Sequence, residues 1–125
     1  MIVGTGIDII EITRIKAAIE RNGERFIMRV FTPAERAYCE ARQACATHFA
    51  GRFAAKEAAF KALGTGWSGN IKWIDVEVEA AINGPPRLKL AGAALVRSEK
   101  LGVTNIHLSI SHSREYAVAT VIFEC

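Results

Sequence analysis

One stretch of the sequence, residues 52–64, combines charged side chains with a run of alanines and phenylalanines. On a helical wheel of about 100° per residue no side of it is plainly polar, which predicts a helix packed on more than one face. Its charged residues are Arg52, Lys56, Glu57 and Lys61. Because charges are almost never buried without partners, they either neutralise one another or face a cleft that receives a charged ligand.

Glu57 lies four residues before Lys61, the order of a helical ion pair worth about 0.2–0.5 kcal/mol. On a wet helix that structural role would be sufficient. Here Arg52 and Lys56 add two further cations, which leaves three cations for one carboxylate. A phosphate-rich ligand would balance the excess, and a metal ion on Glu57 would connect to it.

Asp8 follows a Gly-x-Gly-Ile run at the end of a predicted strand. A carboxylate there could bind a hard cation such as Mg²⁺, which takes one or two carboxylates together with phosphate and water oxygens. The alternative is an N-cap for the helix that follows, and the residue taken alone favours this alternative.

His112 ends the run Ser109-Ile110-Ser111-His112. Its pKa near neutrality would let it hold a phosphate or pass a proton, although a histidine at a strand end is equally often a surface residue. Neither serine lies in a nucleophile-elbow pattern, so a serine–histidine hydrolase is unsupported.

Three arginines, Arg14, Arg21 and Arg25, follow one side of the first predicted helix and its end. Such a run is usually a solvated face. It also suits docking of an acidic protein, and the sequence leaves both interpretations open.

The first half of the chain predicts one strand and three helices that would position these side chains. Residues 2–9 predict the strand, and isoleucines at helical spacing follow to about residue 22. Thr32-Pro33-Ala34-Glu35 has the capping threonine, first-turn proline and capping-box glutamate of a helix start, and this helix is expected to run toward Ala44. The charged helix ends at Gly64 as a C-cap, and residues 64–70 predict a mobile, glycine-rich loop.

In the second half of the chain, the spacing of the apolar residues changes to every second position. Ile74, Val76 and Val78 alternate with acidic residues, which predicts a strand with one wet face. Asn83-Gly84 would turn the chain into a returning strand over 87–90, followed by a helix over 91–101 and a hairpin of strands 106–111 and 117–123. The sum is an α+β domain with an antiparallel sheet packed against helices.

Composition fits a single domain. The chain has 125 residues, 50% of them hydrophobic and 23% charged, which argues against disorder. A net charge of +3 allows anionic partners but falls short of a nucleic-acid-binding protein. Three cysteines without metal-ligand spacing suggest reduced thiols, and the apolar runs are too short for a signal peptide or a membrane span. We therefore expect a soluble, cytoplasmic protein that binds neither nucleic acid nor membrane.

Together these residues resemble the small 4′-phosphopantetheinyl transferases, of the holo-acyl-carrier-protein synthase type of bacterial fatty-acid synthesis. The resemblance covers nearly the whole chain and rests on two signature elements, Gly6-Ile7-Asp8 and residues 53–62, the latter followed by Leu63-Gly64. Asn83-Gly84-Pro85-Pro86 and residues 109–112 give weaker support. The two signatures together are specific in residue type and in separation, whereas either alone would be weak.

The resemblance implies an enzyme that moves the phosphopantetheine arm of coenzyme A onto a serine of apo-acyl carrier protein and releases adenosine 3′,5′-bisphosphate. Asp8 and Glu57 would ligate Mg²⁺, which also binds the coenzyme A diphosphate. Glu57 and Lys61 would be catalytic, with Lys61 on the diphosphate. The remaining expected contacts are Arg52, Gly64 and His112 for coenzyme A and Arg14, Arg21 and Arg25 for the acidic carrier.

The general base stays open between a metal-bound water, Glu57 and Glu35, and for Glu35 the capping role is favoured. Family members often carry more basic residues before the signature helix than residues 42–48 supply here, so some coenzyme A contacts would differ or come from another subunit. Small members resemble one another in forming homotrimers with active sites between subunits. Asp8 and Glu57 of one subunit would then face His112 or the Pro85-Pro86 loop of the next.

Two other functions remain open on the sequence. One is a non-enzymatic module that binds nucleotide or acidic protein through the same basic groups. The other is a metal-dependent hydrolase of a nucleotide diphosphate, against which the arginine run argues mildly, because a hydrolase needs no protein-docking face.

Overall fold

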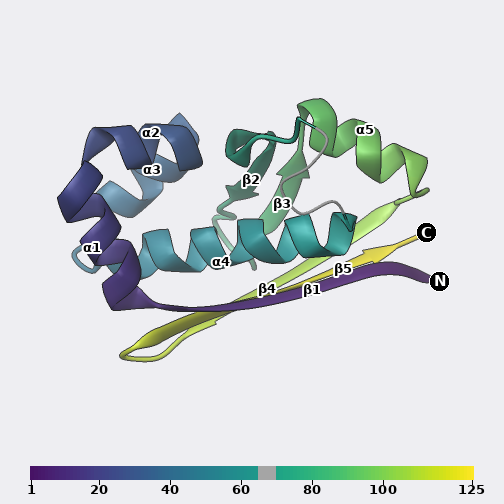
Figure 1. Ribbon diagram of the computed structural model, residues 1–125. Helices are drawn as coiled ribbons and strands as arrows, with labels where there is room; N and C mark the ends of the chain where they lie inside the picture. The colour runs from purple at the N-terminus through teal and green to yellow at the C-terminus, as the bar shows by residue number, and fades with distance from the viewer. Residues whose placement is uncertain (65–69) are drawn as a thin grey trace.

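One helix, α4 (Cys45–Leu63), lies lengthwise on a sheet of three long strands, and the other elements pack around it (Figure 1). The computed structural model describes residues 1–64 and 70–125. The sheet is formed by β1 (Ile2–Glu11), β4 (Asn105–His112) and β5 (Tyr116–Glu124). The remaining elements are α1 (Ile12–Asn22), α2 (Glu24–Val30), α3 (Pro33–Glu40), the 3₁₀ turn η1 (Trp73–Asp75), β2 (Val76–Glu79), β3 (Arg87–Leu90) and α5 (Gly92–Lys100).

The large sheet is antiparallel, with the strand order β1-β5-β4. β1 and β4 therefore form its two edges. Asp8 pairs with Ala119 in the central strand, and Ala119 pairs with Ile110 on the far strand. β2 and β3 form a separate two-stranded hairpin. The predicted α+β class and the antiparallel pairing are confirmed.

The backbones of β1 and α4 meet without intervening side chains. A Cβ built on Gly6 would overlap the carbonyl oxygen of Ala58, and one built on Gly4 would overlap that of Ala62. Only glycine allows so close an approach, because any other residue would push the strand off the helix. The Gly-x-Gly spacing thus fixes the distance between β1 and α4 and the position along α4 that Asp8 faces.

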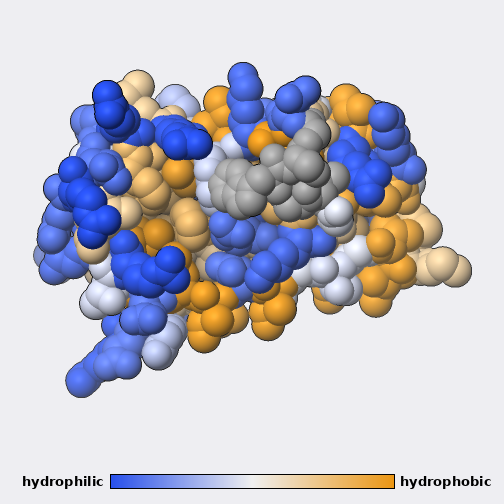
Figure 2. Space-filling view, in the orientation of Figure 1, coloured by the Kyte–Doolittle hydropathy of each residue, from blue (hydrophilic) through white to orange (hydrophobic). Residues whose placement is uncertain are grey.

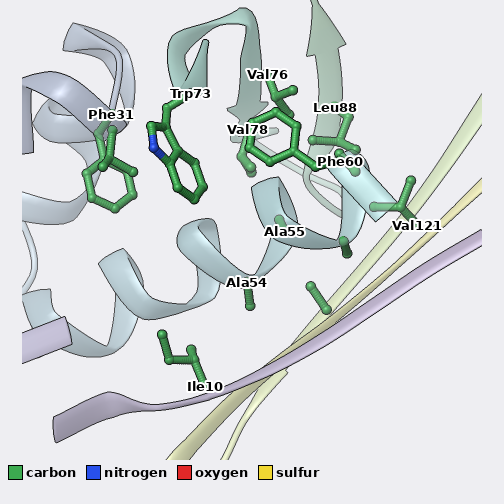
Figure 3. Close-up of a cluster of buried hydrophobic side chains, with 14 of the residues drawn as sticks. Ile10, Phe31, Ala54, Ala55, Phe60, Trp73, Val76, Val78, Leu88 and Val121 are labelled. Atoms are coloured by element: carbon green, nitrogen blue, oxygen red, sulfur yellow. The ribbon is translucent and has the colours of Figure 1, made fainter. Parts of the chain in front are cut away.

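The hydrophobic core lies on both sides of α4. Figure 3 shows Ile10 of β1 beneath the helix and Phe31, Trp73 and Phe60 above it. The Trp73 ring stacks on Phe53 with 5.1 Å between ring centroids. Burial on both sides explains why this helix has no polar face, as the sequence predicts.

The face of the large sheet turned away from α4 remains apolar and exposed in the single chain. Ile7 and Ile9 of β1 are 59% and 63% exposed, and Ile122 of β5 is 36% exposed. Hydrophobic residues gather along the lower edge of the molecule in Figure 2, where Figure 1 places β1. Uncovered apolar area of this kind marks a contact surface more often than a solvated one.

Several boundaries differ from the sequence-based prediction. Helix α1 ends at Gly23 (φ 54°, ψ −131°), and a further helix, α2, begins directly after it. α3 ends at Glu40, before the predicted Ala44. Ile74, predicted on the buried face of a strand, is 45% exposed in η1. The side chain of Asp75 accepts from the Lys72 N–H at 3.0 Å and curls the backbone there, so the strand begins only at Val76.

Two predicted helix caps are confirmed. Thr32 and Glu35 form the reciprocal capping box, and Gly64 ends α4 in the left-handed region at φ 75°. The predicted loop lies mostly outside the described residues, since 65–69 are not among them. No helix in the described ranges is both long and apolar enough to cross a membrane.

The contact between β1 and α4 leads to a stability prediction. We expect Gly6→Ala to lower the free energy of unfolding by about 3 kcal/mol, because the added methyl must displace backbone rather than a flexible side chain. Urea denaturation at fixed protein concentration measures this. The matched control is Gly84→Ala, where the nearest atom to the new Cβ is 3.9 Å away. A Gly6→Ala protein as stable as the control would contradict the contact.

Candidate active site

Asp8 and Lys61 meet where β1 crosses α4. The Lys61 ammonium donates to the Asp8 carboxylate at 3.3 Å and to the carbonyl of Ile7 at 2.8 Å. The glycine contact described above brings these residues together, although they are 53 positions apart in the sequence. Asp8 is not an N-cap: the cap of α1 is Glu11, and the side chain of Asp8 is turned to Lys61 instead.

Glu57 adds a second carboxylate to this cluster. Burial and then the negative charge of Asp8 raise the pKa of Glu57, while Lys61 lowers it. Burial also raises the pKa of Asp8, and Lys61 and Arg14 oppose that shift. Lys61 acts on both carboxylates and Arg14 on Asp8 alone, yet the pKa of each carboxyl stays raised. An added cation would stabilise both in their charged form.

These two carboxylates fit a magnesium ion better than a metal held wholly by protein. Among the described residues, no group of three or more His, Cys, Asp or Glu side chains could hold a metal. Magnesium takes one or two protein carboxylates and completes its shell with water and substrate phosphates. The hard oxygen donors of Asp8 and Glu57 suit that kind of site.

Lys56 does not belong to the candidate site. Its side chain is 0% exposed, and its ammonium lies 2.8 Å from the Glu35 carboxylate. It also donates to the carbonyls of Trp73 and Val76. Burial lowers the pKa of Lys56, and Glu35 opposes that shift. The expectation of three cations for one carboxylate on α4 is therefore wrong: Glu35, from another helix, neutralises one of them.

The favoured structural role of Glu35 is confirmed, and this role excludes it as a general base. One carboxylate oxygen accepts from the Thr32 N–H at 2.8 Å, and the other accepts from the Val78 N–H at 2.7 Å. With the Lys56 bond, Glu35 joins α3, α4 and β2 in the core.

Arg52 and His112 lie together in a second site. They line a cavity of about 200 Å³ whose other lining residues are Tyr38, His48, Ala80, Ala81, Gly84, Pro86 and Ile110. Arg52 is 5% exposed, and its Nε atom has no hydrogen-bond partner among the described residues. The rings of His48 and His112 are 6.3 Å apart between centroids. This cavity can receive a small anion, because a buried guanidinium and two imidazoles face it.

The two groups of predicted site residues lie on different sides of α4. Asp8 is on β1 and His112 on β4, the opposite edges of the large sheet. Arg52 and Lys61 are nine residues apart, which places them roughly 180° apart around the helix. One chain therefore forms two half-sites and not one cleft. The first is the cluster of Asp8, Glu57 and Lys61, and the second is the cavity lined by Arg52 and His112.

Gly64 stands three residues after Lys61 at the end of α4. Its N–H already bonds to the carbonyls of Phe60 and Lys61. The Arg97 Nε donates to the neighbouring Leu63 carbonyl at 3.1 Å. Gly64 is exposed and has no side chain, so a ligand can come close to the backbone beside Lys61. The N–H of Gly64 is already bonded and is not free to bind that ligand.

The three arginines expected to bind a protein partner are all exposed. Hydrophilic residues gather over α1 and α2 in Figure 2. The positive charge of Arg14 reaches Asp8, since it lowers the pKa of that carboxyl. Arg25 lies in α2, beyond the break at Gly23, so the helical wheel of α1 does not place it.

Tyr38 and His48 are site residues that sequence reasoning did not single out. Tyr38 comes from α3, 14 positions before Arg52, and only the packing of α3 on α4 joins them. No short-range spacing could have revealed this contact.

Comparison with known families identifies a match that covers most of the chain. The model of the 4′-phosphopantetheinyl transferase superfamily matches residues 4–121. The chain belongs to this superfamily. The family resemblance predicted from Gly6-Ile7-Asp8 and the α4 motif is confirmed.

Individual members of the superfamily match along the full chain. A holo-[acyl-carrier-protein] synthase from Koribacter versatilis is 49% identical, covering 99% of each chain. The crystal structure of the holo-[acyl-carrier-protein] synthase from Neisseria meningitidis has a TM-score of 0.91 at 31% identity and covers both chains completely. A structure of the Bacillus anthracis holo-(acyl-carrier-protein) synthase in complex with CoA (3′,5′-ADP) has a TM-score of 0.81 at 39% identity, over 98% of this chain and 96% of that one. The phosphopantetheinyl transferase fold is thereby established.

The pair Lys56–Glu35 leads to a second stability prediction. We expect Lys56→Met to lower the free energy of unfolding by about 3–5 kcal/mol, because it leaves a buried carboxylate without its cation. The control is Lys16→Met on the exposed surface of α1, expected to change it by less than about 0.5 kcal/mol. Equal unfolding midpoints and slopes in urea for the two variants would contradict a structural role for Lys56.

Proposed function

We propose that this chain is a holo-acyl-carrier-protein synthase, which transfers the 4′-phosphopantetheine group of coenzyme A to a serine of apo-acyl carrier protein. The observation that carries the proposal is the cluster of Asp8, Glu57 and Lys61, which the contact between β1 and α4 assembles inside the two signatures of the superfamily. Relatives of that name, one of them in complex with CoA (3′,5′-ADP), support it.

In the reaction, the serine oxygen forms a bond to the phosphorus of phosphopantetheine, and the bond from that phosphorus to the bridging diphosphate oxygen breaks. The serine loses its proton, and adenosine 3′,5′-bisphosphate leaves. Magnesium, when held by Asp8 and Glu57, would supply a Lewis acid to the diphosphate. Lys61 would place a positive charge on the same diphosphate, which is the electrostatic stabilisation that phosphoryl transfer requires.

Glu57 is the protein carboxylate best placed to hold the proton of the serine. Glu35 is buried and bonded at both oxygens. Glu57 is partly exposed, so it can be reached by the serine hydroxyl or by a bridging water. A bound magnesium ion would lower the pKa of Glu57, and a metal-bound water then remains the alternative base.

The cavity around Arg52 would bind the remaining phosphate of coenzyme A. Lys61, together with a magnesium ion held by Asp8 and Glu57, would bind the diphosphate, which leaves the 3′-phosphate of the adenosine for Arg52 and His112. The two half-sites would meet between subunits of a homotrimer, with the Asp8 side of one chain facing the Arg52 side of the next. The exposed face carrying Ile7, Ile9 and Ile122 supports this assembly, because covering it would bury apolar area.

The acidic carrier would dock on the exposed arginines of α1 and α2, next to the cluster that holds the diphosphate. The influence of Arg14 on Asp8 supports this placement, since it puts the basic surface close to the reacting groups. The proposed setting is the cytoplasm, where the modified carrier would serve fatty-acid synthesis.

Intact mass spectrometry of apo-acyl carrier protein, incubated with this protein, coenzyme A and Mg²⁺, tests the proposed activity. We expect the carrier to gain one phosphopantetheine group, and EDTA to abolish the gain. Glu57→Gln should lose at least about a hundredfold in rate with its fold intact, because it removes a metal ligand and a candidate base. An unmodified carrier with cleaved coenzyme A would indicate a hydrolase instead. Intact coenzyme A and an unmodified carrier would indicate a binding module.

The docking surface is tested by charge reversal at a residue away from Asp8. We expect Arg21→Glu to raise KM for the carrier about tenfold while KM for coenzyme A stays within twofold, because like charges now meet in the encounter. Lys16→Glu is the control, with the same change of charge about 140° away around α1. Equal effects of both variants on the carrier, or equal effects of Arg21→Glu on both substrates, would rule out this surface.

A further inference from the structure

The ring of Tyr38 lies between two guanidinium groups. The Cζ of Arg42 stands 3.4 Å from the ring centre, and the Cζ of Arg52 stands 3.8 Å from it. At such distances the two guanidiniums must occupy opposite faces of the ring. His48 completes the group, since its ring meets Tyr38 edge-on with centroids 5.8 Å apart.

A carboxylate is missing from this arrangement. Within residues 1–64 and 70–125, neither Arg42 nor Arg52 forms a salt bridge. Arg42 donates from Nη1 to the Tyr38 carbonyl at 2.6 Å, and the buried Nε of Arg52 has no partner there. The two charges are held by an aromatic ring, whose negative face attracts cations without neutralising them.

The cavity keeps its positive potential as a result. The pKa of His48 is lowered by burial first and then by the positive charges of Arg52, Arg42 and His112. Lys56, one turn along α4 from Arg52, has its own carboxylate in Glu35 and faces the core instead.

The size of the cavity points to one kind of occupant. At about 200 Å³ it is smaller than the roughly 300–1,000 Å³ typical of whole-ligand pockets. A phosphate monoester suits it better than a complete nucleotide, and a carboxylate at the position of Tyr38 would compete with that phosphate for Arg52.

We propose that Tyr38 is a positioning residue for phosphate recognition: its ring holds the Arg52 guanidinium at a fixed depth in the cavity and leaves its charge available to the 3′-phosphate of the adenosine. This inference rests on the proposed function, because it takes the phosphate from coenzyme A. Arg52 contacts the phosphate, and Tyr38 acts through Arg52. Arg42, on the opposite face of the ring, adds positive potential at the exposed end.

Calorimetric binding of two nucleotides to the whole protein tests the role of Tyr38. The nucleotides are adenosine 3′,5′-bisphosphate and adenosine 5′-monophosphate, which differ by the 3′-phosphate alone. We expect Tyr38→Leu to weaken binding of the bisphosphate about tenfold, which lies between the sizes of an exposed and a desolvated cation–π contact, and to leave the monophosphate within twofold. Tyr38→Phe keeps the ring and should bind both like the wild type.

Two further variants separate positioning from packing. Tyr38→pentafluorophenylalanine keeps a ring of similar shape but reverses the charge distribution of its face, so it should weaken the bisphosphate as Tyr38→Leu does. This variant also serves if the leucine protein does not fold. In an Arg52→Ala background, Tyr38→Leu should cause no further loss of bisphosphate affinity.

The possible results divide clearly. Equal weakening of both nucleotides, an undiminished loss in the Arg52→Ala background, or wild-type affinity for the pentafluorophenylalanine protein would each overturn the inference while leaving the transferase untouched. A wild-type protein that binds the monophosphate and the bisphosphate equally would overturn the assignment of the cavity to the 3′-phosphate, and the inference with it. Failure of the wild type to bind either nucleotide would overturn the proposed function itself.

Discussion

The close approach of β1 to α4 is the constraint on which the rest of the structure depends. Gly4 and Gly6 let the strand lie directly on the helix backbone, and the alanines of α4 have short side chains that do not hold the strand away. Asp8, two residues further along the strand, then reaches Lys61 and comes near Glu57. The side of α4 away from the sheet is free to receive Trp73 and its aromatic neighbours, which hold the hairpin β2–β3 in place.

The charges of α4 serve three separate purposes, and their order along the helix determines which. Lys56 points into the core and joins three elements through Glu35. Glu57 and Lys61 point toward β1 and form the cluster suited to a metal and a diphosphate. Arg52 points toward the far edge of the sheet and lines the small cavity with His112. A motif of a few residues therefore builds a core contact and two half-sites at once, because a helix distributes neighbouring positions around its circumference.

The sequence predicts those features that depend on local chemistry. The capping box at Thr32, the C-cap at Gly64, the two-sided burial of α4 and the two signatures are all readable from residue types and spacing, and the structure and the family match confirm them. Long-range pairing is not readable in this way. The partnership of Lys56 with Glu35 and the sandwich around Tyr38 depend on which elements pack together. The separation of His112 from Asp8, on opposite edges of the sheet, was expected from the family resemblance alone and not from residue spacing. The helix α2 went unpredicted because Gly23 looked like the end of a helix and not like a break between two helices.

The contact at Gly6 also limits how this protein can evolve. When two side chains clash, a smaller residue on either side can restore the fit, so neighbouring positions can change in turn. At Gly6 the opposing atom is the carbonyl oxygen of Ala58, which every amino acid carries. No second substitution at position 58 can make room for a side chain at position 6. Position 6 must remain glycine for as long as α4 packs directly on β1. A lineage that replaced this glycine would also have to change how the helix packs on the strand.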